Sequence, residues 1–167
     1  MIDLTDEEKA RYYHRSFTAV DGLWCMKAEE KYGFDAALEI DREVWKVLPK
    51  IQARMLKSMA SSGNGLAALR EAIETKLTLE HYSFSVAEDG EGEGFTVSVH
   101  ECPWYTLMVK SGREHLAEKV GRAICAVEYS AWASEFGDTI SAEFPELLCG
   151  GKECCSIKFS LDKKRDT

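Results

Sequence analysis

The chain has 167 residues, a net charge of −8 and 45% hydrophobic residues, which predicts a soluble globular protein with one domain, residues 1–167. The acidic balance excludes a broad nucleic-acid surface, because phosphate binding needs clustered Lys and Arg. No apolar run approaches the ~20 residues of a membrane helix, and the acidic start, residues 1–6, lacks the features of a signal peptide. We therefore expect a cytoplasmic protein with no membrane or nucleic-acid partner.

The first stretch of the chain has helical signals. Thr5 and Glu8 form a capping box that predicts a helix starting near Asp6. Asp21 is placed to cap a second helix, and Gly33 is a natural stop for it.

The next stretch predicts two further helices. Asp35 opens a long helix in which Pro49 should produce a kink, since proline lacks an amide donor. The polar break at residues 61–65 ends it, and Asn64 is placed to cap a fourth helix that runs through Leu66 and Leu77.

After this helix the apolar residues no longer recur every 3.6 positions, as in a helix, but every second position, as in a strand. Residues 82–86 and 95–99 alternate between apolar and polar, with an acidic, glycine-rich segment between them, which predicts an antiparallel hairpin. Two more strands are expected at 139–148 and 154–161, and Pro145 implies an edge position or a bulge in the first of them.

A prominent helix is predicted from about Arg113 to Phe136, with an apolar stripe along one side. The expected fold is α+β: a helical N-terminal half with a four-stranded antiparallel sheet and this long helix packed on the sheet.

One side of the long helix carries a candidate site. Cys125, Glu128 and Trp132 are spaced i, i+3 and i+7, so a thiol, a carboxylate and an indole share a face beside the apolar stripe. The alternatives are that Cys125 fills the core, that Glu128 is solvated or paired along its helix, and that Trp132 is a core aromatic.

Five of the six cysteines lie between residues 102 and 155. Thiols stay reduced in the cytoplasm, so this number favours metal binding, redox chemistry or catalysis over structural disulfides. In the last strand Cys154 and Cys155 point to opposite faces, and the sequence leaves open which of them is functional.

Cys125, the Glu146-x-x-Cys149 motif and Cys155-x-Ile-x-Phe resemble the C-terminal part of 4-vinyl reductase domains. This resemblance implies a non-catalytic small-molecule-binding or sensor domain with a structural zinc. Its ligands would be Cys125, Glu146, Cys149 and Cys155, a set that suits tetrahedral Zn²⁺.

The segment Ile124–Tyr129 and the Gly150–Phe159 ending, with its glycine and cysteine pairs, are similar to the L-2-amino-thiazoline-4-carboxylic acid hydrolase family. The segment from Trp24 to Trp45 is similar to the front half of uncharacterised relatives of that group. This second resemblance implies a hydrolase that opens a small cyclic amidine.

The hydrolase reaction would need a nucleophile, proton-transfer groups and a carboxylate-binding group. Under this hypothesis Cys125 is the nucleophile and Glu128 the general base. The remaining candidates are His115 and His100 for proton transfer and Arg113, Arg122 and Trp132 for substrate binding. Strand alternation places His100 outward, which favours a surface histidine. The hydrolase is our main prediction and the zinc-containing sensor its alternative, with a redox or metal carrier third; a homodimer is left open.

Overall fold

The computed structural model describes residues 2–60, 63–90 and 92–162, and the chain divides into two compact units, Met1–Asp41 and Arg42–Thr167. In the first unit, helix α1 (Asp6–Tyr32) begins at the predicted capping box: Glu8 N–H donates to Thr5 Oγ1 at 3.2 Å, and Thr5 N–H donates to Glu8 Oε2 at 2.8 Å. Gly33 ends α1 with a φ of 85°. The predicted cap at Asp21 is wrong, because α1 continues through it: one glycine after Asp21 costs about 1 kcal/mol, too little to end so long a helix.

The next helices are α2 (Phe34–Trp45), which crosses the boundary between the units, α3 (Leu48–Ala60) and α4 (Leu66–Leu79). The single kinked helix predicted here is two helices. Pro49 lies in the first turn of α3, where a missing amide donor breaks no helical hydrogen bond. The residue that caps α4 is Gly65, not Asn64, because Asn64 Oδ1 accepts a hydrogen bond from Lys57 Nζ at 2.6 Å.

The sheet is antiparallel, with strand order β1-β2-β4-β3. Its strands are β1 (Ser83–Glu88), β2 (Gly94–Glu101), β3 (Ile140–Glu146) and β4 (Cys155–Leu161); between them lie α5 (Pro103–Lys110), α6 (Glu114–Phe136) and the short 3-10 turn η1 (Leu148–Gly150). The predicted hairpin and both C-terminal strands are confirmed. Pro145 lies in the edge strand β3, within the stretch where its register against β4 shifts.

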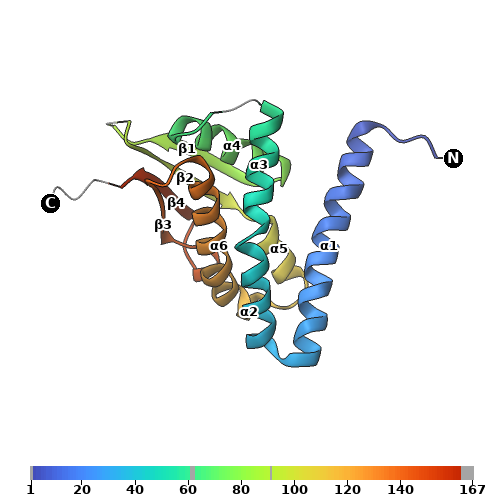
Figure 1. The fold of residues 1–167 in the computed structure, drawn as a ribbon. Helices are drawn as coiled ribbons and strands as arrows, with labels where there is room; N and C mark the ends of the chain where they lie inside the picture. Colours follow the sequence, from blue (N-terminus) through green and yellow to red (C-terminus); the bar gives the residue numbers. More distant parts are fainter. Residues whose placement is uncertain (1, 61–62, 91, 163–167) are drawn as a thin grey trace. The chain divides into compact units, whose positions relative to one another are not determined.

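The core of the second unit forms where helices α4 and α6 cover the sheet, with α3 packed against α6 (Figure 1). The sheet contributes every second side chain of β2 and β4 to this core, because successive side chains of a strand point to opposite faces of the sheet. The largest fully buried side chains of this unit are Trp132, Phe136, Phe159, Leu69, Ile73, Leu77, Val97, Val99 and Pro49. The predicted α+β architecture, with the long helix on the sheet, is confirmed.

Candidate functional site

Helix α6 brings Cys125, Glu128 and Trp132 to its inner side, as their spacing predicts. Glu128 is 5% exposed and Trp132 is fully buried, while Cys125 is partly buried and packs against the core. A carboxylate this deep in the protein must find a partner, since an unpaired buried charge is very costly.

The partner of Glu128 is Lys76 of α4, which is 3% exposed. Lys76 Nζ lies 2.8 Å from Glu128 Oε1 and 2.9 Å from Glu80 Oε2. Both contacts are ion pairs, and the contact with Glu80 is also a charge-assisted hydrogen bond. One ammonium is therefore held between two carboxylates.

Two tyrosine rings complete this arrangement. Lys76 Nζ lies 5.3 Å from the ring centroid of Tyr82 and 5.5 Å from that of Tyr129, within range of cation–π attraction. Tyr129 is also in ring contact with Phe144 and Phe159 of the sheet. We call Lys76, Glu80, Tyr82, Glu128 and Tyr129 the buried polar cluster.

Burial and charge act in opposite directions on the cluster. Burial lowers the pKa of Lys76, but the charges of Glu128 and Glu80 outweigh burial and raise the pKa of Lys76 above its usual range. Burial raises the pKa of Glu128, and the neighbouring Lys76 ammonium offsets only part of that increase. Burial also raises the pKa of Tyr82 and of Tyr129 well above the ordinary value. Lys76 is therefore a permanent cation and both phenols are neutral near pH 7.

Two buried polar atoms of the helices have no hydrogen-bond partner in the described residues, Gln52 Oε1 and Trp132 Nε1, whereas Glu128 Oε1 has the Lys76 ammonium at 2.8 Å. Gln52 belongs to α3 and reaches the cluster through its amide, which donates to Glu80 Oε1 at 3.4 Å. Trp132 lies one helical turn after Glu128. Buried polar atoms are nearly always paired, so Gln52 Oε1 and Trp132 Nε1 call for an additional partner such as a water or a ligand.

The turn that leads from α4 to β1 places Tyr82 in the cluster. His81 has a φ of 62°, the one positive φ of a non-glycine residue in the described chain. Its N–H donates to Thr78 O at 3.1 Å, and Tyr82 N–H donates to Leu77 O at 2.9 Å, which is the hydrogen-bond pattern of a Schellman turn. A left-handed conformation at a residue with a Cβ costs about 1–2 kcal/mol, and this strain lies at the edge of the cluster.

Several thiols influence one another beside the cluster. Burial raises the pKa of Cys125 well above its usual range, and the charges of Glu128 and of three other thiols, Cys102, Cys155 and Cys149, add to the effect. Leu148 N–H donates to Cys155 Sγ at 3.1 Å, and Cys149 packs on Gly121 of α6 so closely that a Cβ there would lie 2.6 Å from Cys149 Sγ. The thiol of Cys125 is therefore a neutral group near pH 7.

The other predicted site residues lie away from this interior. His100 and His115 are exposed, and His100 Nε2 lies 3.1 Å from Ser85 Oγ on the outer face of the sheet. Arg122 is exposed and bonds Glu118 at 2.8 Å, while Arg113 is partly buried at the start of α6. The structure does not bring these four residues together with Cys125 and Glu128.

The predicted zinc ligands also do not assemble. Glu146 is exposed and pairs across the sheet with Ser156, so it lies on the face opposite to Cys155. In the ranges that the structure describes, no group of three or more His, Cys, Asp or Glu side chains is placed to hold a metal ion. Zinc binding by Cys125, Glu146, Cys149 and Cys155 stays a prediction.

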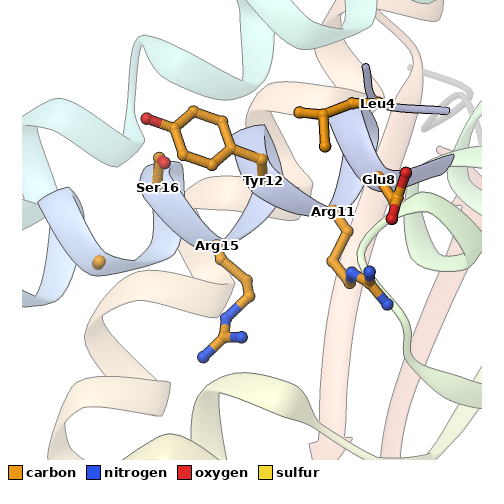
Figure 2. Close-up of a pocket in the computed structure, with 7 residues that line it drawn as sticks. Leu4, Glu8, Arg11, Tyr12, Arg15 and Ser16 are labelled. Carbon is orange, nitrogen blue, oxygen red and sulfur yellow. The ribbon is translucent and has the colours of Figure 1, made fainter. Parts of the chain in front are cut away.

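Two surface hollows lie elsewhere. One follows α1, where Tyr12 and Ser16 extend from one side of the helix and Arg11 and Arg15 from the other (Figure 2). The second is polar and is lined by residues of the β1–β2 turn and of β3 and β4, among them Asp89, Glu143 and Lys158. None of the predicted site residues lines either hollow, so neither hollow carries the chemistry expected from the sequence.

Sequence reasoning missed Lys76, Glu80 and Tyr129. The signal for Lys76 was present, because it follows Ile73 by three residues and precedes Leu77 on the apolar side of α4. A lysine in an apolar stripe predicts a buried carboxylate partner. The identity of that partner required the packing of α4 against α6.

The α+β fold is similar to that of two solved structures that contain small ligands. One is the phenol-responsive sensory domain of the transcription activator PoxR with phenol, at a TM-score of 0.54 and 14% identity, covering 86% of this chain and 73% of that one. Another is a trafficking protein particle complex subunit 3 from Naegleria fowleri covalently bound to palmitic acid, at a TM-score of 0.54 and 12% identity, covering 92% and 97%. At these identities the likeness concerns the fold.

The chain belongs to DUF6125, a family of unknown function whose model matches residues 6–156. No curated protein matches the chain. The likeness to a sensory domain agrees, at the level of fold, with the sensor alternative that the resemblance to 4-vinyl reductase domains implies, while the hydrolase resemblance stays a prediction. No helix in the described residues is long and apolar enough to span a membrane.

Proposed function

We propose that this protein is a small-molecule-binding domain of the sensor type, with its ligand site at the buried polar cluster. The observation that carries the proposal is the buried ion pair of Lys76 and Glu128 together with two buried polar atoms that lack partners in the described residues: Gln52 Oε1, whose amide contacts Glu80, and Trp132 Nε1, one helical turn from Glu128. Binding sites of this kind are mostly apolar, with a few polar groups that orient the ligand.

The likeness to two proteins whose structures contain phenol and palmitate supports the same class of function. Hydrolysis with Cys125 as nucleophile is less well supported. The reactive form of a thiol is the thiolate, and burial beside Glu128 raises the pKa of Cys125. Glu128 is also engaged by Lys76 and is not free to act as a base.

The test uses the indole N–H of Trp132 as a reporter in ¹H–¹⁵N spectra, assigned with Trp132→Phe. Phenol and a palmitate analogue are the first probes. A ligand at the cluster should shift the Trp132 signal saturably, while the indole of Trp24 in the other unit serves as the control. If no probe shifts the Trp132 signal in a saturable way, the proposed site is wrong.

The zinc of the predicted sensor is tested separately by elemental analysis of the purified protein. Stoichiometric zinc that is lost in Cys149→Ala and retained in Cys25→Ala would support the predicted ligand set. Zinc that stays bound in Cys149→Ala would contradict it.

A further inference from the structure

The buried polar cluster carries an unbalanced charge. Lys76 supplies one positive charge, whereas Glu128 and Glu80 supply two negative charges, and the Glu80 side chain is only 12% exposed. In the described part of the chain, Lys76 and Glu128 are the charged residues that the protein buries. With both carboxylates ionised the cluster has a net charge of −1, which a bound cation would neutralise.

The hydrogen-bonding capacity of the cluster is unbalanced in the same direction. Gln52 Oε1 is a buried acceptor without a partner in the described residues, and Glu128 Oε1, which is paired with Lys76, keeps a second lone pair for another donor, whereas Trp132 Nε1 is the one unpartnered donor of the helices. Glu80 Oε1 receives a long contact of 3.4 Å from Gln52 and can accept a stronger donor. A ligand that supplies several N–H donors therefore matches the site better than a ligand that mainly accepts hydrogen bonds.

The aromatic surroundings also favour a positive ligand. The rings of Tyr82 and Tyr129 lie 5.3 and 5.5 Å from a cation already present, the ammonium of Lys76. The faces of aromatic rings carry negative potential and attract cations, most strongly where water is excluded. The partly buried Phe144 and the fully buried Phe159 are in ring contact with Tyr129, so this side of the cluster is aromatic and apolar.

The cluster reaches the surface at the C-terminal end of α4. Glu80, Tyr82 and Gln52 are partly exposed there, whereas Lys76, Glu128 and Tyr129 are buried. The strained turn at His81 lies between two of the partly exposed residues. A ligand that enters from this end meets Glu80 first and the ion pair of Lys76 and Glu128 behind it.

We propose that the ligand of the buried polar cluster is a small organic ammonium ion with an apolar body. Its N–H groups donate to the carboxylates of Glu80 and Glu128 and to the amide oxygen of Gln52, and its apolar part packs on the aromatic rings. This inference rests on the proposed small-molecule-binding function and adds the charge and hydrogen-bonding class of the ligand.

The test compares three probes of nearly equal size: benzylammonium, benzyl alcohol and benzoate. Titration calorimetry at pH 7 should give a benzylammonium affinity at least about tenfold higher than that of benzyl alcohol, which corresponds to one added charge-assisted hydrogen bond. Benzoate should not bind measurably. Glu128→Gln should lower the benzylammonium affinity about tenfold and leave the benzyl alcohol affinity unchanged, because the variant keeps the shape and removes the charge.

Glu135→Gln is the matched control, since Glu135 pairs with Arg54 at the surface and away from the cluster. Circular dichroism reports whether each variant is folded. If Glu128→Gln does not fold, Glu80→Gln removes the second, partly exposed carboxylate and should cause a similar loss.

The outcomes separate the two proposals. Equal affinity for benzylammonium and benzyl alcohol would overturn the cationic ligand class and leave the small-molecule-binding function standing. Benzylammonium binding that Glu128→Gln and Glu80→Gln both leave unchanged would also overturn the inference, because it would reflect general attraction to an acidic protein. If none of the three probes binds, and phenol and the palmitate analogue also fail to shift Trp132, both proposals are wrong.

Discussion

Replacing Lys76 by methionine tests whether the buried polar cluster is an ion pair that the fold depends on. Methionine has a similar length and no charge, so Lys76→Met leaves the carboxylates of Glu128 and Glu80 buried without their cation. Removing one partner of a buried pair typically destabilises a protein by about 3–5 kcal/mol. We expect a loss near the lower end of this range, because Glu80 retains some contact with water and protonation can neutralise Glu128.

The assay is urea unfolding at pH 7, followed by circular dichroism. The double variant Lys76→Met/Glu128→Gln should recover more than 1 kcal/mol relative to the sum of the two single variants, because the deeply buried Glu128 charge is gone and only the partly exposed Glu80 carboxylate remains unpaired. Lys27→Met is the control: its pair with Glu30 is largely exposed, and loss of such pairs costs about 0–1 kcal/mol. A cost below about 1 kcal/mol for Lys76→Met would refute the structural role of the cluster.

Three further predictions concern pH, the strained turn and the packing of a thiol. The pKa values of Tyr82 and Tyr129 are raised in the folded state, so the folded protein keeps phenol protons that the unfolded chain releases above about pH 10. The free energy of unfolding should therefore fall above that pH, by up to ~1.4 kcal/mol per pH unit for each tyrosine. His81→Gly should stabilise the protein by about 0.5–1 kcal/mol in urea unfolding, because glycine adopts the positive φ without strain. Gly121→Ala should be at least ~1 kcal/mol more favourable in a Cys149→Ala background than in the parent protein, because the alanine methyl group would collide with Cys149 Sγ.

Each of these predictions has its own check. A free energy of unfolding that stays constant between pH 8 and pH 11 would contradict the raised pKa values. His100→Gly, in the extended strand β2, should destabilise the protein, so stabilisation by both histidine replacements would contradict the role of the turn. Equal effects of Gly121→Ala in the two backgrounds would contradict the close contact between Gly121 of α6 and Cys149 of η1.

The elements of the fold could be predicted because their signals are local. The capping box at Thr5 and the alternation of the hairpin strands each lie within a few residues. The break near Pro49 was misplaced because a proline is compatible both with a kink and with the first turn of a new helix. Only the geometry around Lys46 and Val47 decides between these two possibilities.

The candidate site could be predicted only in part. Helical spacing placed Cys125, Glu128 and Trp132 on one side of α6, and the structure keeps them there. The ion pair with Lys76 joins residues 52 positions apart in the chain, so no local pattern reveals it. The distance of His100 and His115 from that site likewise depends on tertiary packing.

The edge strand β3 has a consequence for association between copies of the protein. An exposed strand edge can pair with another sheet through its free backbone groups, which is a common route to aggregation. In β3, Pro145 offers no N–H group, and the exposed Glu143 and Glu146 would bring like charges together across such a pairing. Sheet-to-sheet growth along β3 is therefore disfavoured, and β1 is the edge through which this sheet could be extended.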